Sequence, residues 1–282
     1  MGADLRRWAC AVLIAIVISF LVLPAALAQT GIKIDAKPGV SSTHFKYITI
    51  AINNITRFFS DNYKIALQKR MRIIIAPDNK TYEEVLLKDF GYPPATAQKD
   101  ARLTAGKARE GKVEYLLLIK ARPSDPVPWI IELACHEIVH WYQFQVAGLK
   151  KVHEVKWIEE GCANVIAFQI VGTMTDKTLD KYRQERSKVL KKAASLPSLK
   201  DLHSPKDWNA ATDKYGGNVV YSKATLAALE LSRRQGGNSI FNYFLKLQQQ
   251  TPIQAFEQAF GLELHKFESE MDQKLNNNDR RK

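Results

Sequence analysis

One short stretch constrains this chain more than any other: His-Glu-Ile-Val-His at residues 136–140. Two histidines four residues apart on a helix lie on the same face, about one turn apart, so His136 and His140 can share a metal ion. Glu137 stands beside the first histidine, where a carboxylate can act as a base toward a ligand of that ion. The stretch therefore predicts a metal-binding helix in the middle of the chain.

A second carboxylate completes the expected ligand set. A catalytic zinc usually has three protein ligands and leaves its fourth position to water. Glu160 follows His140 by twenty residues, which leaves room for one helix to end near Gly148 and a second helix to return beside it. Neutral imidazoles together with a carboxylate suit zinc, so we expect one zinc ion per chain.

The segment around Glu160, Trp-Ile-Glu-Glu-Gly-Cys-Ala at residues 157–163, resembles the WLxEGxA segment of gluzincins. This is the superfamily of thermolysin and aminopeptidase N, and the resemblance is closest to its exported peptidase MA-like branch. Carried over by position, it implies His136, His140 and Glu160 as zinc ligands and Glu137 as the general base, whereas Glu159 occupies a variable position. The resemblance covers roughly residues 40–275. Its specific elements are the two motifs, and the flanking segments share only the hydrophobic pattern.

The remaining pattern predicts an α+β fold. Residues 71–76 and 113–121 are typical of strands, and residues 81–86 of a capped helix start after a turn at 77–80. The resemblance implies a gluzincin-type metallopeptidase, in which a small mixed sheet lies over the metal helix and a mostly helical lobe follows. It also implies a substrate bound antiparallel to an edge strand at residues 113–121.

Helical spacing locates three further elements. The metal helix should begin with Ser124 or Asp125 as its cap and end at Gly148. Residues 176–192 are strongly charged and predict a helix at the surface. An amphipathic first helix is indicated by five apolar residues at helical spacing, Phe45, Ile48, Ile52, Ile55 and Phe59.

The N-terminus has the features of a targeting segment. A basic region, an apolar run and a small-residue cleavage site predict a signal peptide over residues 1–28, with an uncleaved membrane anchor as the alternative. We therefore expect an exported protein, periplasmic or secreted. Its catalytic domain is predicted to span residues 29–275, with an α/β lobe at 29–148 that includes the metal helix and a helical lobe at 149–275. Residues 276–282 are expected to form a disordered tail.

Charge limits the expected partners. Without residues 1–28 the chain has 39 basic and 28 acidic residues, a net charge of +11. Such a balance favours polyanions or acidic membranes. The basic residues are dispersed, however, and form no nucleic-acid-binding motif, so we expect no nucleic-acid partner. The expected partner is a peptide or protein substrate, membrane contact requires an uncleaved N-terminal segment, and the oligomeric state is open.

Several other residues are candidates for supporting roles. Asn164, one turn after Glu160, can orient a ligand histidine, and Gln143 resembles the last position of an HExxHxxQ variant, with a role next to the ligands or only in packing. A developing oxyanion needs a donor besides the metal. The resemblance points to a tyrosine from the helical half, Tyr221 at the opening of a helix, with Tyr215 as the alternative.

The cysteines and the other histidines suggest less chemistry. Cys135 and Cys162 flank the metal motifs, and we favour two buried thiols over a disulfide. Three histidines have no partner at ligand spacing and are interpreted as ordinary surface or loop residues, namely His153, His203 and His265.

The sequence thus predicts an exported zinc metallopeptidase that hydrolyses peptide bonds with zinc-activated water and Glu137 as the base. An endopeptidase is expected, because residues 90–130 contain nothing similar to the GxMEN segment that marks the free-amine site of the aminopeptidase branch. One alternative is a non-catalytic binding or cell-envelope assembly module that keeps the fold. Another is a basic factor that adheres to anionic envelope polymers.

Overall fold

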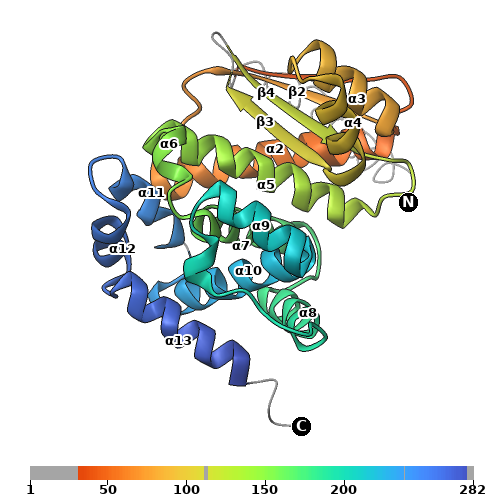
Figure 1. Cartoon of the computed structure of the whole chain (residues 1–282). Helices are drawn as coiled ribbons and strands as arrows, with labels where there is room; N and C mark the ends of the chain where they lie inside the picture. Colours follow the sequence, from red (N-terminus) through yellow and green to blue (C-terminus); the bar gives the residue numbers. More distant parts are fainter. Residues whose placement is uncertain (1–30, 111–113, 238, 278–282) are drawn as a thin grey trace, which may run out of the picture. The chain divides into compact units, whose positions relative to one another are not determined.

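The computed structural model describes residues 31–110, 114–237 and 239–277, so the predicted signal peptide lies outside the described residues. Helices and one four-stranded mixed sheet make up the described chain, which confirms the α+β class (Figure 1). Two compact units divide it. The sheet unit contains Phe59–Arg122 and the described residues up to Ser41, and the helical unit contains Ser42–Phe58 and the residues from Pro123 onward.

The sheet unit is built on strands β1 (Ile32–Ala36), β2 (Arg70–Ala76), β3 (Gly106–Glu110) and β4 (Glu114–Lys120). Both strands predicted from the sequence are confirmed as β2 and β4. The spatial order is β1-β2-β4-β3, with β1, β2 and β4 parallel and β3 antiparallel to β4. The pairing places Ile73 of β2 opposite Leu117 of β4 in the centre of the sheet.

The prediction that residues 113–121 form an edge strand is wrong. β4 pairs with β2 on one side and with β3 on the other, so it is an inner strand, and the edges are β1 and β3. The pairing with β3 occupies the edge that the prediction left open, and the continuous apolar run over residues 116–119 is typical of a central strand in a parallel sheet. The short β3 carries charged residues instead, as exposed edges commonly do.

Helices α3 (Asn79–Lys88) and α4 (Pro94–Leu103) connect β2 to β3 and pack against the sheet. Their core is formed by Tyr82 and Leu86 of α3 with Ile74 of β2 and Leu118 of β4, all fully buried. Helix α3 begins two residues before the predicted start at residue 81, because Asp78 caps it by accepting a hydrogen bond from the Thr81 amide.

Helices α5 (Val127–Ala147), α7 (Lys156–Met174) and α10 (Gly217–Gln235) form the centre of the helical unit, where α7 packs against both of the others (Figure 1). The metal helix is α5, and it ends before Gly148 as predicted. It belongs to the helical unit rather than to the sheet unit with which the sequence grouped it. Gly148 has a φ of +79°, a conformation that glycine adopts without strain.

The predicted cap of α5 is wrong. Pro126 occupies the cap position, with no side-chain hydrogen bond, instead of Ser124 or Asp125. Pro126 and Pro128 have no amide proton, and the Trp129 amide donates to the Pro126 carbonyl oxygen. Few unpaired amides are therefore left at this helix start, so a side-chain cap is not required.

The other helical elements surround this centre. Helix α8 (Leu179–Lys191), predicted over residues 176–192, buries only Tyr182 and Leu190, and its charged residues are exposed or partly exposed. Helix α13 (Leu264–Asn277) continues through the first two residues of the predicted tail, and residues 278–282 lie outside the described part of the chain. The peripheral elements are α6 (Leu149–Val152), α8 (Leu179–Lys191), η1 (Leu199–Leu202), α9 (Pro205–Tyr215), η2 (Ser239–Phe241), α11 (Asn242–Leu247), α12 (Pro252–Phe260) and α13 (Leu264–Asn277).

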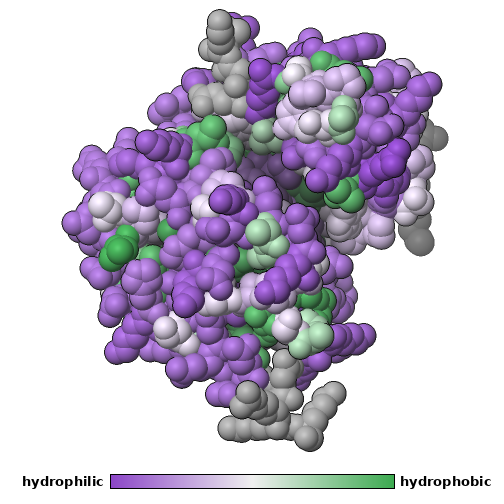
Figure 2. Space-filling view, viewed as in Figure 1, coloured by the Kyte–Doolittle hydropathy of each residue, from purple (hydrophilic) through white to green (hydrophobic). Residues whose placement is uncertain are grey.

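The first predicted helix is α2 (Ser42–Tyr63), and the unit boundary falls within it. Four of its five predicted apolar residues are fully buried, whereas Phe45 is 41% exposed. Hydrophilic side chains cover most of the surface in Figure 2. None of the described helices has both the length and the apolar character that a membrane span needs.

Candidate metal centre

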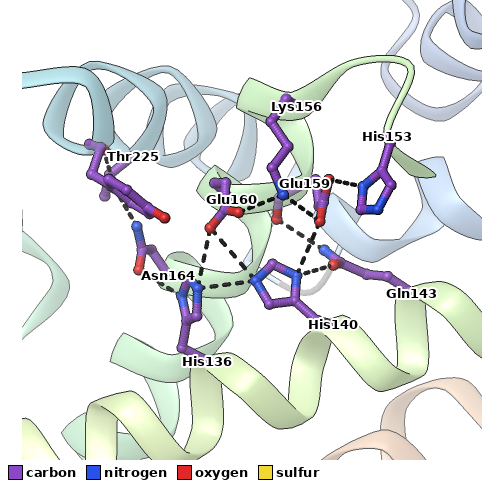
Figure 3. Close-up of polar contacts among 10 residues, drawn as sticks. His136, His140, Gln143, His153, Lys156, Glu159, Glu160, Asn164 and Thr225 are labelled. Carbon is purple, nitrogen blue, oxygen red and sulfur yellow. Dashed lines mark hydrogen bonds and ion pairs between the residues drawn. The ribbon is translucent and has the colours of Figure 1, made fainter. Parts of the chain in front are cut away.

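Two helices bring the three predicted metal ligands together. His136 and His140 lie one turn apart on α5, and Glu160 lies in the first turns of α7 (Figure 3). Between them the chain reverses at Gly148 and passes through α6, so that α7 returns beside α5. All three side chains are buried, and their ligand atoms lie within 4.8 Å of one another. In the described part of the chain, this is the one such group of three or more His, Cys, Asp or Glu residues.

The three ligand atoms form a nearly regular triangle. The Nε2 atoms of His136 and His140 are 3.0 Å apart. Oε2 of Glu160 is 3.2 Å from Nε2 of His136 and 3.5 Å from Nε2 of His140. Three ligands of a tetrahedral zinc at about 2.0–2.1 Å are separated by about 3.3–3.4 Å. The spacing therefore fits three corners of a tetrahedral site.

Asn164 sets the tautomer of His136. Its Oδ1 lies 2.8 Å from Nδ1 of His136, and its Nδ2 donates to Oγ1 of Thr225 at 2.8 Å. Because the amide nitrogen is occupied by Thr225, the oxygen faces the imidazole, and Nδ1 of His136 is the donor. The contact that the sequence predicted for Asn164 is confirmed, and it leaves Nε2 of His136 with a lone pair toward the ligand triangle.

Gln143 has the same role for His140. Its Nε2 donates to the Glu159 carbonyl oxygen at 3.0 Å, and its Oε1 lies 2.8 Å from Nδ1 of His140. The imidazole therefore donates from Nδ1 and presents the lone pair of Nε2. Gln143 thus contacts a ligand directly, which decides between the two roles that the sequence left open for it.

The triangle can hold a cation. Two imidazole lone pairs and a carboxylate oxygen converge, and within the described chain the buried Oε2 of Glu160 accepts no hydrogen bond. Burial opposes a charge on His140, but the nearby Glu160 carboxylate overcomes this and raises the pKa of His140 to about 9. A proton and a metal ion compete for the same lone pair, so a site that attracts the one also attracts the other. These residues therefore fit a divalent metal ion.

Glu160 is held as a carboxylate. Burial favours its protonated form, but the charges of Lys156 and His140 keep the pKa of Glu160 well below its ordinary value. Lys156 contacts Oε1 of Glu160 at 2.7 Å and Oε1 of Glu159 at 2.7 Å (Figure 3). Oε1 of Glu160 is therefore occupied, and Oε2 is the oxygen directed at the histidines.

The predicted general base is available for chemistry. Glu137 is half-buried on α5, and among the described residues its carboxylate forms no hydrogen bond or ion pair. A proton acceptor has to have an unoccupied lone pair, and the other carboxylates beside the site, Glu159 and Glu160, are already paired.

The two candidate tyrosines differ in their surroundings. Burial of the phenol, followed by the carboxylates of Glu160 and Glu137, raises the pKa of Tyr221 well above its ordinary value, so this hydroxyl keeps its proton. Trp208 packs edge-on against the Tyr221 ring at 5.0 Å between ring centroids. Tyr215 ends α9, with Lys214 over its ring. Thr225, which accepts a hydrogen bond from Asn164, donates to the Tyr221 carbonyl oxygen, so Tyr221 lies near the candidate metal centre.

His153 lies in the turn after α6, as expected for a loop residue, but it also contacts a residue beside the site. Its Nδ1 lies 2.9 Å from Oε2 of the buried Glu159, so Glu159 links His153 to Lys156. Lys156 was not predicted either, although it precedes Glu159 by three residues and Glu160 by four, which is the spacing of ion pairs within a helix. No local pattern pointed to His153. Cys135 and Cys162 are free and buried, as favoured from the sequence.

No protein-family model matches this chain, and no curated protein matches it.

Proposed function

We propose that this protein is an exported zinc metallopeptidase of gluzincin type, with His136, His140 and Glu160 as the zinc ligands. The observation that carries the proposal is the convergence of three ligand atoms beside an unpaired carboxylate, Glu137. The two motifs that resemble gluzincins supply the same ligands and the same base. An endopeptidase is proposed because residues 90–130 contain no segment similar to GxMEN.

A zinc ion held by His136, His140 and Glu160 would supply a Lewis acid that polarises a carbonyl group and lowers the pKa of water. Glu137 takes the proton from the attacking water and passes it to the leaving nitrogen. Tyr221, which keeps its proton, donates a hydrogen bond to the oxyanion that forms on the carbonyl oxygen. Asn164 and Gln143 keep both imidazoles in the ligand tautomer during the reaction.

The test is Glu137→Gln in the chain from residue 29 onward. Glu137 is not a ligand, so the variant should keep about one zinc per chain while hydrolysis of a mixed peptide library falls about 10²- to 10⁴-fold. Zinc is measured by atomic emission and hydrolysis by mass spectrometry. Glu154→Gln is the matched control, because it removes the same charge from an exposed residue near the site.

Three outcomes separate the functions. Zinc retained by a His136→Ala, His140→Ala double variant would contradict the ligand assignment. Zinc without any hydrolysis by the unmodified chain would favour the non-catalytic binding module. Cleavage of N-terminally blocked peptides supports the endopeptidase, whereas release of single residues from unblocked peptides alone would favour an aminopeptidase.

A further inference from the structure

Lys156 stands at a position where its charge is unfavourable on local grounds. It is the first residue of α7, and positive charges are disfavoured there because the helix dipole is positive at its N-terminus. Its side chain is also largely buried, with 14% of its surface exposed. Burial of an ammonium group costs free energy unless it is well paired. A residue that breaks two local rules indicates a function for its charge.

The contacts of Lys156 show where that charge acts. Its ammonium lies 2.7 Å from Oε1 of Glu160 and 2.7 Å from Oε1 of Glu159. The position of Glu159 is fixed in turn by the contact between its Oε2 and His153 at 2.9 Å. Because Glu159 also holds the Lys156 ammonium, this ammonium cannot move freely with Glu160 if the Glu160 carboxylate rotates.

The two oxygens of Glu160 have different partners. Oε1 faces the Lys156 ammonium, whereas Oε2 faces the Nε2 atoms of both histidines. A carboxylate without such a restraint can bind a metal ion through one oxygen or through both. Binding through both oxygens would use the position that a catalytic site leaves open.

We propose that Lys156 is a positioning residue that holds Oε1 of Glu160 and so presents the single oxygen Oε2 to the metal ion. This rests on the metal site of the proposed function, but not on the hydrolytic reaction. It predicts that removal of the ammonium changes the coordination of the bound metal rather than its presence.

The experiment uses Co²⁺ as the probe in the chain from residue 29 onward, because four-coordinate Co²⁺ absorbs visible light more strongly than five-coordinate Co²⁺. Lys156→Met should bind one Co²⁺ with a dissociation constant no weaker than that of the unmodified chain, and its visible absorption should fall several-fold. Lys156→Arg keeps a cation beside Oε1 and should restore the absorption. Lys150→Met, an exposed lysine in α6, is the control and should leave it unchanged.

Unchanged absorption in Lys156→Met, with the metal bound, would overturn the proposal. The ion pairs of Lys156 with Glu159 and Glu160 would then only stabilise the first turn of α7. Failure of the unmodified chain to bind Co²⁺ would overturn the metal site and this role with it. Co²⁺ binding without peptide hydrolysis would overturn the peptidase alone. Lys156→Met leaves the buried carboxylate of Glu159 without its ammonium partner, which can prevent folding. In that case Glu159→Gln is added to remove this charge, and the double variant is compared with Glu159→Gln alone.

Discussion

At the candidate metal centre, two amide side chains decide which nitrogen of each histidine is available. Asn164 and Gln143 each use their amide nitrogen elsewhere, in contacts with Thr225 and with the Glu159 carbonyl oxygen, so their oxygens are left for the imidazoles. Thr225 itself donates to the Tyr221 carbonyl oxygen at 2.7 Å. The ligand geometry is therefore set by hydrogen bonds that extend from α5 and α7 into α10.

Tyr221 is predicted to affect the rate of the reaction and not the binding of the metal ion. Tyr221→Phe removes the donor but keeps the ring that packs against Trp208, so turnover should fall about 10²-fold with zinc content and KM nearly unchanged. Steady-state kinetics on a cleaved library peptide measure this. Tyr215→Phe is the matched control, and a loss confined to that variant would transfer the role to Tyr215.

Individual site residues were predictable where the signal is local in the chain. His136 and His140 follow from spacing along one helix, and Asn164 follows from its place one turn after Glu160. The contacts of His153 with Glu159 were not predictable, because they depend on how the chain turns between α5 and α7. The preference for Tyr221 over Tyr215 came from the family resemblance, and the structure adds the nearby Glu160 and Glu137 charges.

At the scale of elements, one glycine controls the distance between two helices. A methyl group at Gly161 of α7 would lie 2.6 Å from the Ala224 carbonyl oxygen and 2.8 Å from Cβ of Ala228, both in α10. Real Cβ atoms do not approach so closely, so α7 and α10 would have to move apart. Gly161 directly follows Glu160, a proposed ligand, which couples this packing to the candidate metal centre.

We therefore predict that Gly161→Ala destabilises the fold, although alanine favours helices by about 1 kcal/mol over glycine. Overpacking should cost about 1–3 kcal/mol and displace Glu160, so zinc binds more weakly. Urea unfolding and zinc titration measure the two effects. Gly217→Ala in α10 is the control, since its methyl group meets only Cγ2 of Thr212 at 3.7 Å. Equal stability of both variants would contradict the prediction.

The sequence predicted the inner strands better than the edges. The apolar runs of β2 and β4 are long enough to recognise, whereas β1 and β3 are short, and β3 carries Lys107 and Arg109. The edge position of β4 was taken from the family resemblance, and without a visible β3 nothing in the sequence contradicted it. Strand order depends on pairings between distant segments, which a single sequence does not reveal.

At the scale of the whole molecule, the metal centre and the tryptophans lie in the same unit. From residue 29 onward the chain has four tryptophans, and all of them belong to the helical unit: Trp129, Trp141, Trp157 and Trp208. Their fluorescence therefore reports the unfolding of the unit that contains His136, His140 and Glu160.

Zinc should stabilise this unit because the ligand triangle exists only in the folded chain. At free zinc about 100 times the dissociation constant, the gain is about 2.7 kcal/mol, or roughly 5–10 °C in the unfolding temperature of a unit of this size. The His136→Ala, His140→Ala variant should show no shift. At a fixed zinc concentration the shift should grow between about pH 6 and about pH 8, because the pKa of His140 is about 9 without metal and zinc has to displace a proton. An equal shift in the variant would mean that zinc stabilises the unit at another position.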